Sequence, residues 1–191
     1  MSPRHDRGPA GPRHPQPAGR LDLRALDVPS GGASASVAPV PIQPITLAGQ
    51  VYTAHPDAPE LRLDAVRAAA AWHLRLRGAL ELRGPCWRCL EDARVPVRMD
   101  ATEIHEEGSD DPEMRSLYVD HGILDLSAWA RDAAVEAMPP AVLCREDCAG
   151  LCGTCGADLN AGPCGCAPAP DPRWGALADL AERLRDTDPE P

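Results

Sequence analysis

The sequence lacks lysine and phenylalanine and is poor in other aromatic residues. All nineteen basic residues are arginine, and the aromatic residues are four Trp and two Tyr, against 22 Pro and 16 Gly. At 191 residues the chain has the length of one domain with tails. A core short of aromatic rings depends on Leu, Val and Ala, so cross-linking by metal ions would compensate for thin packing.

Long hydrophobic runs are missing as well. No window of about 18 apolar residues exists, which excludes a membrane-spanning helix. Residues 1–20 carry charges but no apolar core of a secretory signal. We therefore expect a cytoplasmic protein with reduced thiols and no membrane partner. The net charge of −10 argues against coating nucleic acid non-specifically, although it leaves room for a local basic face.

A recognisable catalytic constellation is also absent. The sequence contains no Gly-rich phosphate loop, nucleophile elbow or paired-carboxylate pattern. Its six histidines are scattered without metal-ligand spacing, which is typical of solvated or hydrogen-bonded side chains. We predict that the protein is not an enzyme, has no catalytic residues and binds no small-molecule substrate.

What the sequence does contain is eight cysteines in two groups, a C-x2-C pair and a later run C-x3-C-x3-C-x2-C-x8-C-x-C. The C-x2-C spacing lets one turn present two thiolates to a single metal ion. Eight thiolates make two closed four-thiolate sites, which favours two structural zinc ions. The predicted metal ligands are Cys86, Cys89, Cys144, Cys148, Cys152, Cys155, Cys164 and Cys166.

Two ways of dividing these cysteines remain open. In the local partition the last four cysteines bind one ion, and the first four bind the other and tie a hairpin to the end of a helix. In the rival partition the two C-x2-C pairs face each other around one ion, as in a zinc ribbon. Spacing alone does not choose between them.

Other cysteine chemistries need contexts that the sequence lacks. Structural disulfides are not expected in a reducing compartment. A thioredoxin-like pair should follow a strand and open a helix, whereas Cys86 follows Gly84-Pro85 on a hairpin and Cys152 lies in a Gly-rich loop. Catalytic zinc keeps an open position and usually has His or carboxylate ligands. An iron–sulfur cluster is the minor alternative.

Alternating apolar and polar residues predict antiparallel strands between residues 60 and 107. Leu, Val and Met alternate with charged residues with a period of two, which gives one buried and one solvated face. The Cys86/Cys89 pair falls at the turn between the second and third of these strands. The segments that carry the pattern are 61–64, 74–83 and 95–99.

Two helices are predicted to pack on these strands. Asp125 can cap a helix over residues 125–138, which Pro139-Pro140 would end. Asp171-Pro172 can start a closing helix over residues 171–185. The predicted fold class is therefore α+β, a small antiparallel meander with packed helices and a C-terminal Cys-rich metal-binding segment at 144–166.

The remaining segments are predicted to be less regular. Residues 1–19 form a disordered basic tail and residues 186–191 a second tail, on either side of a domain at 20–185. Ordered structure begins with a strand-like stretch at Leu21–Leu26, whereas Pro29–Pro44 is a loop with at most one edge strand. Residues 100–113 hold seven acids, which predicts a solvated acidic loop.

Arginines gather in the predicted hairpin. Residues 62–98 carry eight Arg and four acidic residues, a local charge of 8 − 4 = +4. Arginine suits bidentate phosphate contact and stacks on unpaired bases, which makes this face a candidate RNA-binding surface. The competing interpretation is an ordinary solvated face that uses Arg because Lys is absent. The candidate residues are Arg75, Arg77, Arg83, Arg94 and Arg98.

Four motifs follow one another in a recognisable order: PCWRCL at 85–90, LDLSAW at 124–129, LCREDCAGLC at 143–152 continuing in CGADLN at 155–160, and DPRW at 171–174. Together they resemble the YceD family, the large ribosomal RNA subunit accumulation proteins. The likeness covers about residues 20–185.

The resemblance implies a bacterial, non-enzymatic ribosome biogenesis factor for the accumulation or processing of large-subunit (23S) rRNA. Its partners would be rRNA or a large-subunit precursor and a ribosomal protein. Some family members lack much of the late cysteine cluster, which implies two separable metal sites. The alternative is an interaction module whose acidic loop docks a basic ribosomal protein without RNA contact. A redox or metal-handling role is a third, more distant alternative.

Overall fold

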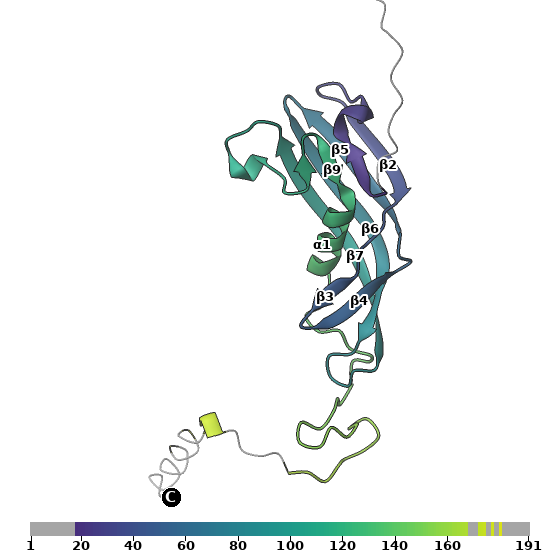
Figure 1. The fold of residues 1–191 in the computed structure, drawn as a ribbon, viewed down its shortest axis with the longest axis vertical. Coiled ribbons are helices and arrows are strands. Elements are labelled where there is room, and N and C mark those ends of the chain that lie inside the picture. The colour runs from purple at the N-terminus through teal and green to yellow at the C-terminus, as the bar shows by residue number, and fades with distance from the viewer. Residues whose placement is uncertain (1–17, 168–171, 175–176, 178–179, 181–191) are drawn as a thin grey trace, which may run out of the picture. The chain divides into compact units, whose positions relative to one another are not determined.

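A computed structural model describes residues 18–167, 172–174, 177 and 180 (Figure 1). The chain divides into two units, Met1–Glu146 and Asp147–Pro191. The first unit contains the strands β1–β9 and the helix α1, and the second contains Cys148 and the last four cysteines. The predicted tails at 1–19 and 186–191 lie almost entirely outside the described residues.

The centre of the first unit is a long hairpin of β6 (Ala71–Pro85) and β7 (Asp92–Glu106). The two strands pair antiparallel along their full length, from Ala71 opposite Glu106 to Pro85 opposite Asp92. The alternating pattern explains the hairpin, because apolar side chains such as Leu76 and Leu82 are buried on one face while charged residues occupy the other.

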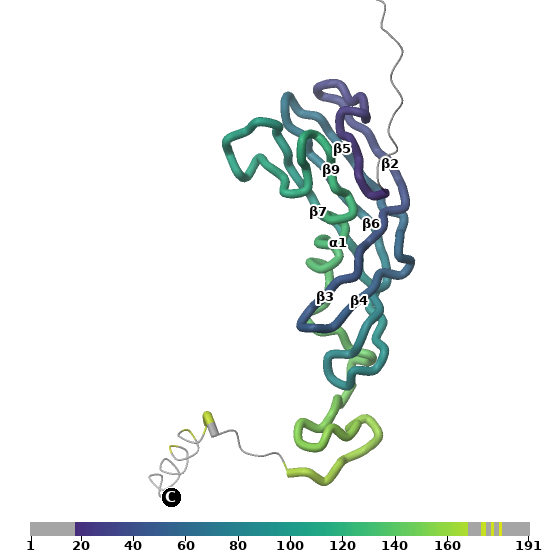
Figure 2. Tube along the Cα trace, viewed as in Figure 1, coloured from purple at the N-terminus to yellow at the C-terminus, as the bar shows by residue number. Residues whose placement is uncertain are grey.

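Shorter strands extend the sheet from the other edge of β6. Because β7 occupies one edge over its whole length, β5 (Glu60–Ala68) and β4 (Gln50–His55) share the opposite edge. β2 (Ala33–Pro39) lies outside β5, and β3 (Ile45–Leu47) lies outside β4, as the trace in Figure 2 shows. The predicted antiparallel meander is therefore present as β5, β6 and β7, within a larger sheet of six strands.

The segment before the meander is more regular than predicted. The edge strand allowed within the predicted loop at Pro29–Pro44 is present as β2, which pairs with β5 at the edge of the sheet. The sequence prediction missed β3 and β4, because they are short and alternate over few residues. β4 nevertheless contributes Tyr52 to the core. The prediction of a strand-like stretch at Leu21–Leu26 is wrong beyond Asp22, because a 3-10 turn begins there.

A second, three-stranded sheet leads into the helix. Its order is β1 (Arg20–Asp22), β9 (Ile123–Asp125) and β8 (Val119–Asp120). α1 (Leu126–Glu136) follows β9 directly, and the Asp125 carboxylate caps it by accepting a hydrogen bond from the Ala128 amide at 3.0 Å. α1 lies against β7 (Figure 1).

The prediction of packed helices is overstated, because α1 is the one α-helix with bounds in the described part of the chain, although Leu177 and Leu180 in the predicted closing helix are helical. Of the predicted closing helix at 171–185, the structure describes a 3-10 turn at Pro172–Trp174 and two further positions; the rest lies outside the described residues. None of the helices among the described residues has the length and apolarity that crossing a membrane requires.

The prediction of an acidic loop at 100–113 is wrong for the first part of this segment. Residues 100–106 belong to β7, where they continue the pairing with β6 down to Ala71. The charged side chains are tolerated in the strand because they fall on or beside solvated positions, as Asp100 does opposite Arg77. The irregular acidic segment therefore starts only at Glu107.

Candidate metal centres and the arginine face

The first group of thiols lies at the turn of the long hairpin. Cys86 and Cys89 are buried between β6 and β7, and the Cys144 Sγ lies 3.5 Å from the Cys89 Sγ. The chain that precedes Cys144 is fastened to this turn, because the Val142 carbonyl accepts a hydrogen bond of 2.8 Å from the Trp87 amide. The backbone thus brings residues from the hairpin and from beyond α1 to one point.

Cys148 is the fourth member of this group. The four sulfurs of Cys86, Cys89, Cys144 and Cys148 lie within 4.8 Å of one another. Only three residues separate Cys148 from Cys144, so chain connectivity alone keeps its thiol within reach. The Asn160 amide holds Cys148, since its Nδ2 donates to the Cys148 Sγ at 3.6 Å and its Oδ1 accepts from the Ala149 amide at 2.8 Å.

The second group lies entirely in the second unit. Its four sulfurs also lie within 4.8 Å of one another, and they belong to Cys152, Cys155, Cys164 and Cys166. The turn that carries the first two is closed by a hydrogen bond of 2.8 Å from the Gly156 amide to the Cys152 carbonyl. Gly156 has a φ of +72°, which is why glycine suits the position.

In each group the surroundings of one cysteine favour the thiolate form that binds metal, whereas hydrogen bonds from Cys155 and Cys164 raise the pKa of Cys166. Burial opposes the ionisation of Cys86, but the backbone amides of Cys89, Arg88 and Cys144 outweigh it and lower the pKa of this thiol to about 6. The amides of Cys155 and Thr154 likewise lower the pKa of Cys152 to about 6. Each group therefore contains one thiol whose pKa lies below the usual value for cysteine.

The donor sets fit zinc. A tetrahedral ion with Zn–S bonds of about 2.3 Å places its sulfurs about 3.8 Å apart. The sulfurs of each group lie within 4.8 Å of one another, which leaves room for this spacing, and the donors are thiols without histidine or carboxylate. Such closed sets suit a structural ion. The cysteines come together as the local partition proposes, whereas the rival zinc-ribbon arrangement is not formed.

The five candidate arginines lie on the outward face of the sheet. In the β6–β7 register, residues 75, 77 and 83 stand opposite 102, 100 and 94, and these positions alternate with the buried ones. The sequence prediction that Arg75, Arg77, Arg83, Arg94 and Arg98 share a face therefore agrees with the register.

Most of these arginines already have acidic partners. The shortest contact joins the guanidinium of Arg77 to Asp64 at 2.6 Å, and the remaining pairs are Arg83–Glu81 at 2.6 Å, Arg75–Asp100 at 2.7 Å and Arg94–Asp92 at 3.7 Å. Hydrogen bonds from Arg62 and then Arg77 lower the pKa of Asp64 to about 2, so this carboxylate stays charged. Arg98 makes no ion pair with the residues that the structure describes.

Sequence reasoning missed part of this neutralisation. It counted acids only within residues 62–98, whereas Asp100 in the neighbouring strand pairs with Arg75. The register that brings them together depends on where the hairpin turns, and charge counts along the chain do not show it. The outward face is therefore less positive than the local count of +4 indicated.

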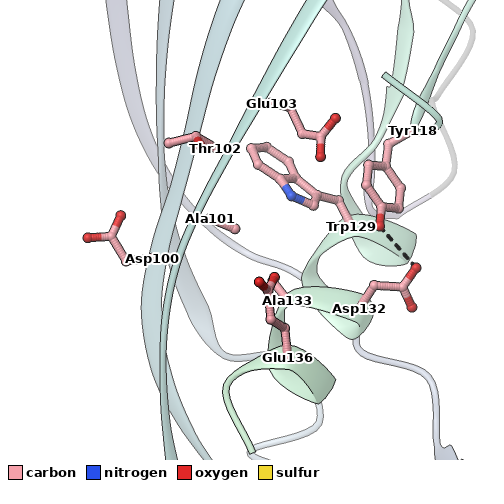
Figure 3. A pocket seen from close by; sticks show the side chains of 9 residues that line it. All are labelled: Asp100, Ala101, Thr102, Glu103, Tyr118, Trp129, Asp132, Ala133 and Glu136. Carbon is pink, nitrogen blue, oxygen red and sulfur yellow. Dashed lines mark hydrogen bonds between the residues drawn. The ribbon is translucent and has the colours of Figure 1, made fainter. Parts of the chain in front are cut away.

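An acidic pocket of about 230 Å³ lies between β7 and α1, and sequence reasoning did not anticipate it (Figure 3). The rings of Tyr118 and Trp129 stack beside it with centroids 6.3 Å apart, and the Tyr118 hydroxyl donates to Asp132 at 3.1 Å. Burial, followed by the charge of Asp132, raises the pKa of Tyr118 to about 12. The charged residues that line the pocket are all acidic: Asp100, Glu103, Asp132 and Glu136.

A family model described as "Large ribosomal RNA subunit accumulation protein YceD" matches residues 74–181, which is more than half of the chain. The chain belongs to the YceD family. The matched region begins on β6 and includes both cysteine groups and α1. The outer strands β2 to β5 precede it, so the YceD match covers the hairpin and the metal centres rather than the whole sheet.

Mycobacterial relatives of this YceD protein are similar over part of their length. Proteins of Mycobacterium bovis and of two strains of Mycobacterium tuberculosis, each described as an uncharacterized protein, are 33% identical over 111 residues. The alignment covers 54% of this chain and 53% of each relative, so the chain spans about half the length of the curated relatives it matches. No solved structure matches it significantly.

Proposed function

We propose that this YceD-family protein is a cytoplasmic, non-enzymatic factor in the accumulation of large-subunit (23S) rRNA, stabilised by two structural zinc ions. The observation that carries the proposal is the family match, which spans the long hairpin and all eight cysteines. The two groups of four thiols support zinc in a structural role, since neither offers the mixed donors of a catalytic site.

Deletion of the gene in its own bacterium tests this function directly. We expect mature large-subunit rRNA to fall relative to small-subunit rRNA and large-subunit precursors to accumulate, as measured by RNA blotting and sucrose-gradient profiles. Complementation with the intact gene is the control. An unchanged ratio of the two mature rRNAs would contradict the proposal.

The arginine face is the proposed route to RNA. Ion pairs between exposed side chains contribute about 0–1 kcal/mol each, so a phosphate can replace a carboxylate partner at little cost. Arg75, Arg77 and Arg98 are distributed along the outward face, and Arg98 has no acidic partner among the described residues. These three side chains could therefore bind phosphates without disturbing the core.

We expect Arg75→Glu, Arg77→Glu and Arg98→Glu together to weaken binding to a large-subunit rRNA fragment by tenfold or more. The slope of log affinity against log salt should also fall by about two, because three phosphate contacts are lost. Arg131→Glu on α1 is the matched control, since Arg131 is half-exposed and paired but lies off the sheet. Unchanged affinity of the triple variant would exclude this face as the RNA contact.

The acidic pocket supports the second candidate, a module that binds a basic ribosomal protein. The acids implicated are those gathered between β7 and α1 rather than a loop at 100–113. Asp100 and Asp132 already pair with Arg75 and Arg131. Glu103 and Glu136 make no ion pair with the residues that the structure describes, so these two carboxylates suit a Lys or Arg side chain and disfavour a phosphate. A protein that binds a basic ribosomal protein but no RNA fragment would favour this candidate.

A further inference from the structure

The two C-x2-C turns adopt one backbone conformation. We call Cys86–Leu90 the first knuckle and Cys152–Gly156 the second. In each, the amide of the last residue donates to the carbonyl of the first Cys, at 3.0 and 2.8 Å respectively. The amide of that Cys in turn donates to the carbonyl five residues later, at 2.7 and 2.8 Å, and the last residue has a φ of +64° or +72°.

The side chains of the two knuckles differ although their backbones agree. Where the second knuckle has glycine and threonine, the first has three large residues. The second knuckle therefore shows that the turn itself requires no large side chain. A positive φ disfavours leucine but not glycine. The backbone conformation therefore does not explain why residue 90 is a leucine. The large residues that the turn does not require are Trp87, Arg88 and Leu90.

Trp87 is held in place with much of its surface open. Its indole N–H donates to the Tyr52 hydroxyl at 2.7 Å, and that hydroxyl donates to the Pro85 carbonyl at 2.9 Å. Tyr52 fits there because residue 84 is glycine; a Cβ at this position would lie 2.4 Å from the tyrosine ring. Trp87 nevertheless remains 48% exposed, and Leu90 is 56% exposed.

Such an exposed, pre-oriented indole contrasts with the use of tryptophan elsewhere in the first unit. Trp72 and Trp129 are buried and serve packing. The chain has no phenylalanine, so few aromatic rings are available for its core. An aromatic ring that is exposed in such a chain is available for contact with a partner. Because its polar end is fixed by Tyr52, the ring loses little conformational freedom when something stacks on it.

The charges beside the first knuckle favour a nucleic acid as that partner. Arg83 and Arg94 are directly opposite each other in the β6–β7 register. Arg83 pairs with Glu81 at 2.6 Å and Arg94 with Asp92 at 3.7 Å, and a phosphate bound between the two arginines would replace these carboxylate partners. Arg83 precedes Cys86 by three residues of extended chain, which is about 10 Å. One short strand of RNA can therefore contact both Arg83 and the first knuckle.

We propose that Trp87, with Arg88 and Leu90, forms a stacking platform for an unpaired base of single-stranded RNA. Zinc knuckles and exposed aromatic rings are recurrent means of holding unpaired bases, and they need no sequence-specific hydrogen bonds. The inference deepens the proposed function: it rests on that function for the identity of the RNA as large-subunit rRNA, whereas the platform itself is argued from the knuckle.

Tryptophan fluorescence of the zinc-loaded full-length protein tests the platform. A Trp174→Phe background removes the other exposed indole, and the remaining two are buried. Titration with a twelve-nucleotide oligouridine should quench the Trp87 emission, whereas a twelve-base-pair RNA duplex should quench it far less. Trp87→Phe, which keeps a ring, should retain most of the affinity.

The second knuckle supplies the decisive variant. Trp87→Gly, Arg88→Thr and Leu90→Gly together convert the first knuckle to the sequence of the second. Because stacking of one base contributes about 1–3 kcal/mol, we expect affinity for oligouridine to fall about five- to 150-fold. Zinc content should stay the same, and Leu90→Gly alone should raise the melting temperature while it weakens binding.

Two results would overturn the platform: unchanged affinity in the converted variant, or no binding of oligouridine by the unaltered protein. If the converted variant still binds RNA but no longer binds a basic ribosomal protein, the first knuckle contacts protein and not a base. In each case the proposed function still stands if gene deletion lowers large-subunit rRNA, so failure of the two ideas can be told apart.

Discussion

Chelation of zinc should unfold the cysteine-bearing segments and remove on the order of 10 kcal/mol of apparent folding free energy. The reason lies in what surrounds the thiols. Among the described residues the second unit has no α-helix with bounds and only one isolated bridge, between Leu151 and Asp158. Its described glycine-rich turns are mostly exposed or half-exposed and bury little, so a metal ion is the main candidate for holding them.

Metal analysis and thermal melting check this expectation. The purified protein should contain about two zinc per chain, and Cys152→Ser should reduce this to about one. Thr154→Ser is the matched control, since it changes the same turn without touching a thiol. Metal-free protein with eight titratable thiols and an unaltered melting curve would contradict the zinc centres.

The two sites should fail separately. The second group lies wholly within the second unit, so Cys152→Ser should leave the sheet and α1 folded. Cys86→Ser should act differently, because Cys86 is buried at the end of the long hairpin and neighbours the segment that ends at Cys144. Near-ultraviolet circular dichroism of the buried Trp129 distinguishes the two variants.

Sequence reasoning succeeded where structure depends on short-range pattern. The β6–β7 hairpin could be predicted because alternation persists over many residues, and the grouping of cysteines because metal ligation favours local spacing. It failed where pairing between distant segments of the chain determines the structure. β3 and β4 are too short to show a period, and the strand at 100–106 is maintained by its pairing with β6 despite its acids.

The candidate site shows the same division. The thiols could be identified from spacing alone, whereas the ion pair between Arg75 and Asp100 depends on the register of two strands. The C-x2-C spacing predicts thiolate ligands and does not single out Trp87, which lies between them. A comparison of the two C-x2-C turns with each other was the available signal, since one carries large side chains where the other has glycine.

Trp129→Ala should cost about 3–5 kcal/mol of stability, the second largest effect we expect. Trp129 is 2% exposed, and it stacks on Tyr118 between α1 and β7 (Figure 3). No phenylalanine elsewhere can compensate for the lost ring. Urea unfolding measures the loss. Leu117→Ala is the matched control, because Leu117 is 96% exposed and its truncation should change stability by less than about 0.5 kcal/mol.

The same variant tests whether α1 supports the first metal centre. α1 leads through the buried Val142, whose carbonyl binds the Trp87 amide, to Cys144. If the docking of α1 positions this segment, Trp129→Ala should also speed the release of one zinc to a chelator while the second group keeps its rate. Equal release rates in the variant and the parent protein would mean that the knuckle and the thiols hold Cys144 without help from the helix.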